Sequence, residues 1–160
     1  MRRFLLILPL CLFLLAAKCA GVQEQPDTQL ELKVYQQSAS QFIEALFAKQ
    51  TIKVLERSGV PFYLNHQAIL NYPEEWEKTL MELFMTAKAT PVQIMALDPL
   101  TAKQMETEHP RDWSQLLQYG FEDKMLLLVT LQPGASGSNL PEEKVLLLMD
   151  DNGKVVGFIR

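Results

Sequence analysis

The sequence has 160 residues, of which 48% are hydrophobic and 21% charged, and its net charge is −4. Outside the N-terminal segment its positive residues are scattered singly, whereas nucleic acids and anionic membrane surfaces are bound by clustered Lys and Arg. Composition therefore excludes both as partners. The only histidines, His66 and His109, lie far apart, and no cysteine follows Cys19, so we predict neither a metal site nor a cofactor.

The first 21 residues have the pattern of a secretory signal peptide. Met1–Arg3 is basic, Phe4–Ala17 is almost entirely apolar, and small residues follow. The apolar run is shorter than the ~20 residues of a membrane-spanning helix and contains Pro9. We therefore predict an exported protein, periplasmic or extracellular, whose mature chain begins between Lys18 and Val22.

Two alternatives concern this N-terminus. One is a retained signal anchor. The other is a lipid-anchored form acylated at Cys19, which Lys18 disfavours because the peptidase for such sites resembles one that requires a small residue there. Removal of residues 1–21 takes away three positive charges and no acid, which moves the net charge from −4 to −7. It also removes both cysteines, so the mature domain must be held by an ordinary hydrophobic core.

Helices are predicted in the first half of the chain, after a short polar tether at residues 22–28. Apolar residues recur at spacings of three and four from Gln29 to Gln50, which places them, Phe42 included, on one helix face. A shorter helix is predicted over Thr51–Arg57. We therefore expect one domain over residues 29–160 that begins with a helix pair.

A small hairpin and a third helix follow. The strands Val60–Tyr63 and Gln67–Leu70 flank Asn65-His66, and both of these residue types tolerate a positive φ. Pro73 is well placed at the first position of the third helix, where its missing N–H costs nothing. Trp76 begins the apolar stripe of that helix.

The second half of the chain is mostly strand. Asp151-Asn152-Gly153 is a strong signal for the last hairpin turn. A short helix that begins at His109-Pro110, carries Trp113 and closes at Gly120 is predicted after the first strand, and a long loop spans Gln132–Glu143. The four predicted strands are Pro91–Leu97, Met125–Leu131, Val145–Met149 and Val155–Ile159.

This order of elements resembles the nuclear-transport-factor-2-like (cystatin-like α+β roll) superfamily over residues 29–160. The resemblance implies an α+β fold in which N-terminal helices pack in the concave face of a curved antiparallel sheet, a cone that often holds a pocket. The charged segment between Pro99 and Pro110 departs from the pattern. The residues that carry the resemblance are Leu55-Glu56-Arg57-Ser58-Gly59, Pro61-Phe62-Tyr63, Glu74-Glu75-Trp76 and the hairpin Val145–Ile159.

Enzymes of that superfamily use an Asp or His base within the cone, often with a Tyr, and such a base must sit in an apolar pocket. The weak catalytic candidates here are Asp98 and His109. Each has a simpler interpretation, because Asp98 precedes Pro99 at a strand end and His109 precedes a helix. His66 is interpreted as a turn residue, so no catalytic motif is visible.

Five aromatic residues are the candidates for ligand binding. A tyrosine on an apolar face usually packs its ring in the core, and its hydroxyl can still face a pocket. We predict a non-catalytic domain that binds a small apolar ligand or a protein partner. The alternatives are a lyase or isomerase and an interaction module whose cone is filled by its own side chains. The candidate residues are Tyr35, Phe42, Tyr63, Trp76 and Tyr119.

A homodimer is predicted from two strands. Met125–Val129 and Val145–Met149 lack the alternation of a sheet with one wet face. If helices cover only one side, the other side exposes an apolar patch larger than monomers usually tolerate. We therefore expect the sheets of two copies to pack together. The alternative is that the tail near Val22–Leu32 or the loop at residues 132–143 folds over this face.

Overall fold

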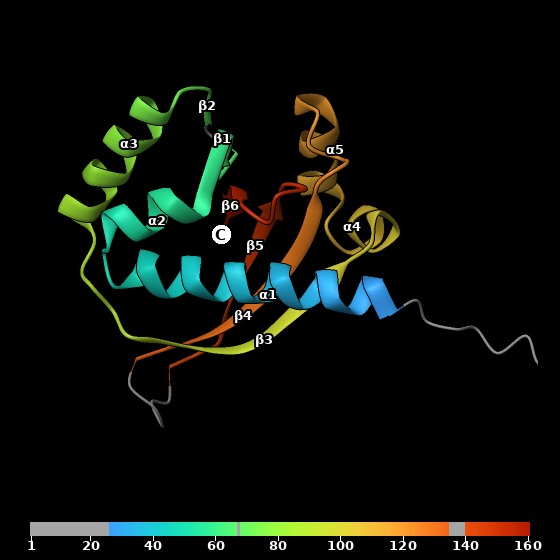
Figure 1. Ribbon diagram of the computed structural model, residues 1–160, viewed down its shortest axis with the longest axis horizontal. Coiled ribbons are helices and arrows are strands. Elements are labelled where there is room, and N and C mark those ends of the chain that lie inside the picture. Colours follow the sequence, from blue (N-terminus) through green and yellow to red (C-terminus); the bar gives the residue numbers. More distant parts are fainter. Residues whose placement is uncertain (1–25, 67, 135–139) are drawn as a thin grey trace, which may run out of the picture.

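The computed structural model describes residues 26–66, 68–134 and 140–160 (Figure 1). The predicted signal peptide, Cys19, residues 22–25 of the tether and residues 135–139 of the predicted loop lie outside these ranges. The described elements are α1 (Pro26–Phe47), α2 (Thr51–Arg57), β1 (Ser58–Leu64), β2 (Ala68–Leu70), α3 (Pro73–Thr86), β3 (Val92–Leu100), α4 (Ala102–Glu108), α5 (Pro110–Tyr119), β4 (Met125–Pro133), β5 (Glu143–Met149) and β6 (Val155–Ile159).

The six strands form one sheet in the order β2-β1-β6-β5-β4-β3. Strands β3 to β6 pair antiparallel with their chain neighbours, as predicted, and β1 pairs antiparallel with β2. Strand β1 lies parallel to β6, so the sheet is mixed rather than wholly antiparallel. With three helices ahead of most of the sheet, the α+β fold class is confirmed.

Local sequence signals fix most element boundaries. Asn65 and His66 adopt φ values of 45° and 60° in the β1–β2 turn, and Gly153 adopts 72° in the β5–β6 turn. Gly120 ends α5 in the left-handed conformation that suits the residue after a helix. Pro73 is the first residue of α3, and α2 has the predicted bounds.

The segment after β3 differs from the prediction. Strand β3 continues through Asp98 and Pro99 to Leu100, which is possible because β3 is an edge strand and a proline there removes no ladder hydrogen bond. Helix α4 follows, and it was not predicted from the sequence. Thr101 Oγ1 accepts from the Gln104 backbone N–H, and Gln104 Oε1 accepts from the Thr101 N–H. This reciprocal pair is a capping box, which fixes the start of the helix.

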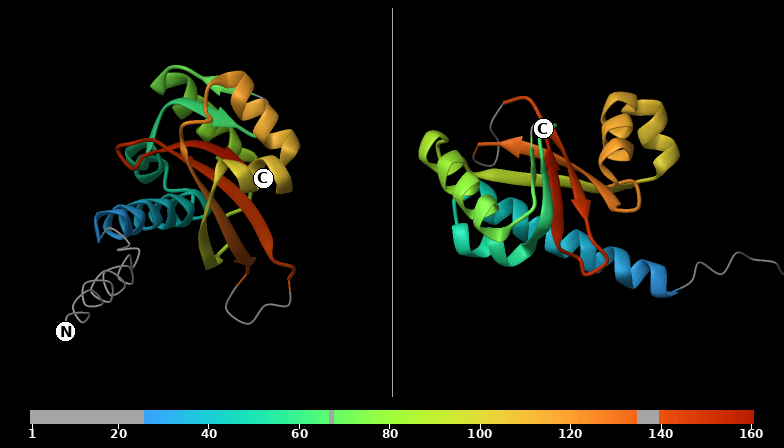
Figure 2. Two further views of the ribbon diagram at one scale, coloured as in Figure 1. Left: turned by 90° about the vertical axis from the view of Figure 1, so that its right-hand side faces the viewer. Right: turned by 90° about the horizontal axis from the view of Figure 1, so that it is seen from above.

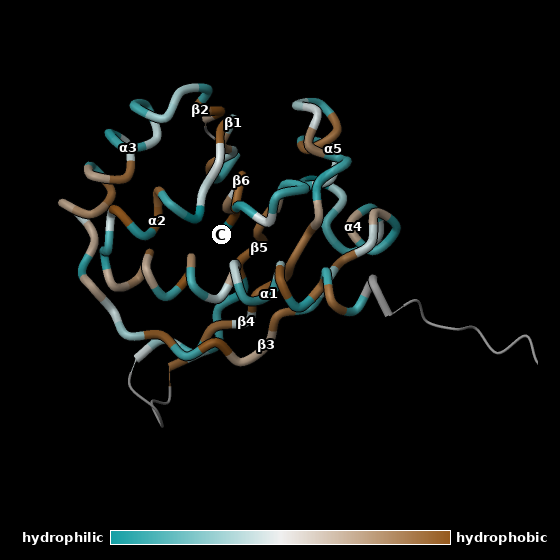
Figure 3. Tube along the Cα trace, in the orientation of Figure 1, coloured by the Kyte–Doolittle hydropathy of each residue, from teal (hydrophilic) through white to brown (hydrophobic). Residues whose placement is uncertain are grey.

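Two apolar clusters lie on opposite faces of the sheet. Odd-numbered residues of β4 and β5, such as Leu127 and Leu147, pack with α1, α2 and α3. Even-numbered residues, such as Leu126 and Leu148, pack with Met105 of α4 and Leu116 of α5. Successive strand residues point to opposite faces, so covering both faces requires continuous apolar strands. Figures 2 and 3 show the helices on both sides and the hydrophobic strands between them.

The second face of the sheet is therefore not exposed, and the expectation that helices cover only one side was wrong. Helices α4 and α5 cover this face, whereas the predicted alternatives were the N-terminal tail and the loop at residues 132–143. The homodimer stays a prediction. The exposed apolar sheet face from which it was inferred is covered by α4 and α5. Within the described ranges, none of the helices combines the length and the apolar character that a membrane crossing requires.

Candidate functional site

The larger described pocket lies on the α1–α3 side of the sheet. It has a volume of about 490 Å3, within the roughly 300–1,000 Å3 typical of small-molecule sites. Helices α1 and α3 form two of its walls, and the connection between α3 and β3 and the ends of β1, β4, β5 and β6 complete the lining. The lining residues are Phe42, Leu46, Phe47, Lys49, Leu64, Asn65, Trp76, Leu83, Phe84, Thr86, Ala87, Lys88, Thr90, Pro133, Glu143, Phe158 and Arg160.

The inner wall of this pocket is rigid and apolar. The Trp76 ring stacks on Phe62 with centroids 4.1 Å apart and an interplanar angle of 11°. Its indole Nε1 donates to Ser58 Oγ at 2.7 Å, and Ser58 Oγ donates to the Val54 carbonyl at 2.9 Å. Since the indole N–H is already bonded within the core, Trp76 presents apolar ring surface to the pocket.

Lys49 joins the two helices beside the pocket. It follows α1 with a φ of 57°, and its Nζ donates to the carbonyl of Phe84 at 2.6 Å and to that of Ala87. Phe84 lies in the last turn of α3 and Ala87 directly follows the helix, where backbone acceptors lack helical partners and a positive charge is favourable. Lys49 therefore stabilises the pocket wall, and its ammonium group is engaged.

The rim carries the remaining polar groups. Asn65 Oδ1 accepts from the Arg160 backbone N–H at 2.8 Å, and the Asn65 N–H donates to the Phe158 carbonyl at 2.9 Å. Arg160 pairs with Glu143 at 2.5 Å, and both side chains are partly exposed. Glu143 is the single acid among the described residues that line the pocket. This arrangement can hold an apolar molecule, but it offers no buried carboxylate for proton transfer.

The structure brings together two of the five predicted ligand-binding residues. Phe42 and Trp76 both line the pocket. Tyr35 lies half-buried against the same core, and its pKa is raised by burial first and then by Asp151, Glu31 and Asp150. Tyr63 packs on the opposite face of the sheet, and Tyr119, partly exposed, lies beside it with ring centroids 5.8 Å apart.

The two catalytic candidates lie apart from the pocket. Asp98 is exposed on the edge strand β3. His109 joins α4 to α5, with its Nδ1 3.8 Å from Asp112 Oδ2. Neither residue lines the pocket. In the described part of the chain, no three His, Cys, Asp or Glu side chains are grouped closely enough to hold a metal ion.

A polar cluster on the second face was not predicted. The Tyr63 hydroxyl lies 2.9 Å from His66 Nδ1 and donates to Gln115 Oε1 at 2.9 Å. His66 Nε2 lies 3.2 Å from Asp112 Oδ1. Burial, followed by Tyr119 and Asp112, raises the pKa of Tyr63. Both nitrogens of His66 have partners, so the cluster ties α5 to the β1–β2 turn.

A smaller pocket of about 190 Å3 adjoins this cluster, between Tyr63, His66, Ala68, Ile69 and Tyr119. It is below the size of typical small-molecule sites. The larger pocket is therefore the candidate functional site. Comparison of the chain with protein-family models, with curated proteins and with solved structures found no match.

Proposed function

We propose that residues 29–160 form a nuclear-transport-factor-2-like domain of an exported protein, periplasmic or extracellular, that binds a small apolar molecule without catalysis. The observation that carries this proposal is the pocket of about 490 Å3 between α1, α3 and the sheet. Its inner wall is apolar, and removal of apolar surface from water contributes about 25 cal/mol per Å2. The order of helices and strands supports the family.

An enzyme is less well supported than a binder. A lyase or isomerase needs a base held in apolar surroundings that faces the substrate. Asp98 and His109 lie outside the pocket lining, and Glu143 is partly exposed and paired with Arg160. An apolar pocket that lacks a buried carboxylate favours binding over catalysis.

An interaction module is also less well supported. Its concave side would be filled by its own side chains, whereas the pocket has the volume of a small-molecule site. A protein partner needs about 800 Å2 of surface on each side of a stable interface. The pocket is a concave site with an inner aromatic wall, which suits a small molecule better.

A charge placed in the pocket wall should weaken binding of an apolar ligand. Leu83 of α3 lines the pocket and is 40% exposed, whereas Met81 of the same helix is 54% exposed and lies outside the lining. We expect Leu83→Glu to weaken binding of the neutral fluorophore phenylnaphthylamine about tenfold or more, because a carboxylate must then be desolvated beside an apolar ligand. Titration of the fluorophore into wild-type and variant protein measures this effect.

Met81→Glu is the matched control, with the same charge change on an exposed residue of the same helix. It should bind the fluorophore like the wild type, and circular dichroism should show both variants folded. Saturable binding that is equal in the two variants would place the ligand elsewhere. No saturable binding to the wild-type protein would contradict the proposed function.

A further inference from the structure

The pocket collects positive charge on a negatively charged protein. Its lining includes three cations, Lys49, Lys88 and Arg160, against one acid, Glu143, whereas the whole chain has a net charge of −4. These residues are far apart in the sequence, and the fold places them in the lining of one pocket. A concave site lined by one sign of charge attracts ligands of the opposite sign. The positive charge in the lining therefore favours apolar molecules that carry a negative charge.

We propose that the pocket selects apolar molecules that carry a terminal carboxylate, such as a medium-chain fatty acid. This inference rests on the proposed function and adds the ligand's head group. The apolar tail would contact Leu46, Phe47 and Phe84, which line the pocket and are half-buried, and the carboxylate would lie at the rim near Lys88 and Arg160. Both cations are exposed, so a carboxylate between them stays partly hydrated and its desolvation cost is small.

The three cations differ in their availability. Lys49 Nζ is engaged by the carbonyls at the end of α3. The ammonium group of Lys88 has no hydrogen bond or ion pair with any other described residue, although it belongs to the pocket lining. Lys88 is thus the cation that a ligand can engage at no cost to an existing contact.

Arg160 is already arranged to bind a carboxylate. Its guanidinium contacts Glu143 Oε2 at 2.5 Å across the rim. A guanidinium has five N–H donors, and this contact leaves some of them available. A ligand carboxylate can share the guanidinium or displace Glu143 from it. Glu143 therefore competes with the ligand, and Glu143→Gln should strengthen binding of an anionic ligand while leaving a neutral one unchanged.

The test compares octanoate with octanol as competitors of bound phenylnaphthylamine at neutral pH. The alcohol is the more apolar of the two, so without charge recognition it should bind at least as tightly. We expect octanoate to bind about tenfold more tightly to the wild-type protein, as two partly exposed ion pairs allow. Lys88→Glu should abolish this preference, Glu143→Gln should increase it, and added salt should reduce it.

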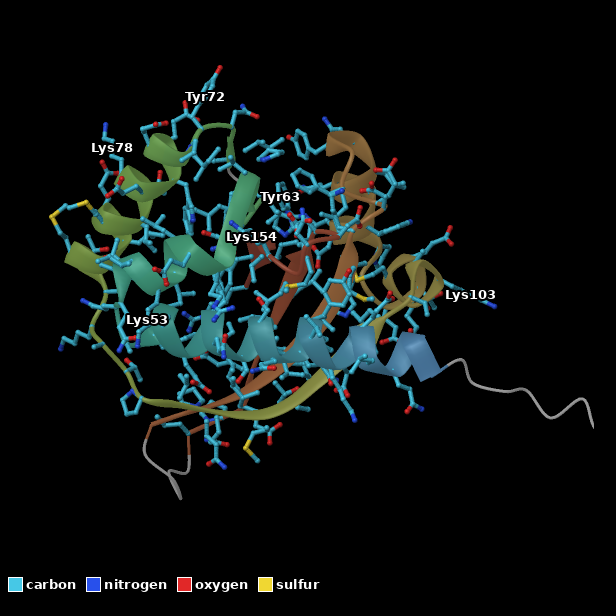
Figure 4. All side chains as sticks on the ribbon, in the orientation of Figure 1. Lys53, Tyr63, Tyr72, Lys78, Lys103 and Lys154 are labelled. Atoms are coloured by element: carbon cyan, nitrogen blue, oxygen red, sulfur yellow. The ribbon has the colours of Figure 1, made fainter. Side chains whose placement is uncertain are left out.

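Lys78→Glu is the matched control, because Lys78 is exposed on α3 and outside the pocket lining (Figure 4). It should keep the wild-type preference. Octanol binding as tightly as octanoate, or a preference unchanged in Lys88→Glu, would overturn the carboxylate inference and leave the proposed function standing. If the fluorophore and both competitors fail to bind, the proposed function itself fails.

Discussion

Phe42→Ala should lower the free energy of unfolding by about 3–5 kcal/mol, the range for removal of a large core side chain. Phe42 lies in the C-terminal half of α1 and is fully buried. Its ring centroid lies 6.3 Å from that of Phe62. The substitution removes apolar contacts and leaves a cavity that the surrounding strands cannot fill. Urea unfolding followed by circular dichroism measures the loss.

Val34→Ala is the control for this prediction. Val34 lies on the same helix and is 56% exposed, so its truncation should change stability by no more than about 0.5 kcal/mol. A loss below about 1 kcal/mol for Phe42→Ala would mean that this face of α1 does not pack against the sheet. The concave pocket would then have no fixed wall.

Leu116→Ala should cost about 2–5 kcal/mol, and Leu117→Ala should cost much less. The two leucines are adjacent on α5, but Leu116 is fully buried against the second face of the sheet and Leu117 is 48% exposed. The pair therefore tests whether α4 and α5 cover that face. Equal, small losses in urea unfolding would contradict this packing and restore the exposed apolar face from which a dimer was inferred.

The homodimer is tested separately, by analytical ultracentrifugation at micromolar concentration. Leu126, Leu146 and Leu148, on the second face of the sheet, are buried and pack with residues of α4 and α5. A dimer, if found, must therefore use another surface. Its interface would have to be located before any function is attached to it.

Local signals in the sequence predicted much of the fold. Helical spacing identified α1 and α3, and Asn65, His66 and Gly153 in the two predicted turns adopt the positive φ values that these residue types favour. Helix α4 was missed because its segment is polar and has one buried residue, Met105. The signal that reveals it is Thr101 followed three residues later by Gln104, a capping box that lies in the sequence itself.

Long-range pairing could not be predicted in the same way. The parallel contact between β1 and β6 joins segments separated by most of the chain, and no local pattern specifies it. The apolar strands β4 and β5 correctly indicated burial on both faces, but not which elements cover the second one. Pairing between β5 and β6 also favours glycine at position 157, because a Cβ there would lie 2.9 Å from Leu148 Cδ1.

The candidate site was only partly predictable for the same reason. Phe42 and Trp76 were found because each lies on the apolar stripe of a helix, and both line the pocket. Lys49, Lys88 and Arg160 are single charges in the sequence, with no spacing that connects them. Their presence in the lining of one pocket follows from the packing of α1 and α3 on the sheet, which sequence patterns do not encode.

The most direct test of the central claim, a small-molecule site on the α1–α3 side, is an amide NMR titration of isotope-labelled protein with phenylnaphthylamine. We expect saturable shifts at amides of the pocket lining, among them Leu46, Leu83 and Phe158. Ala68, Ile69 and Tyr119, beside the smaller pocket, should not respond. Shifts confined to that second group, or no saturable shifts at any amide, would contradict the account.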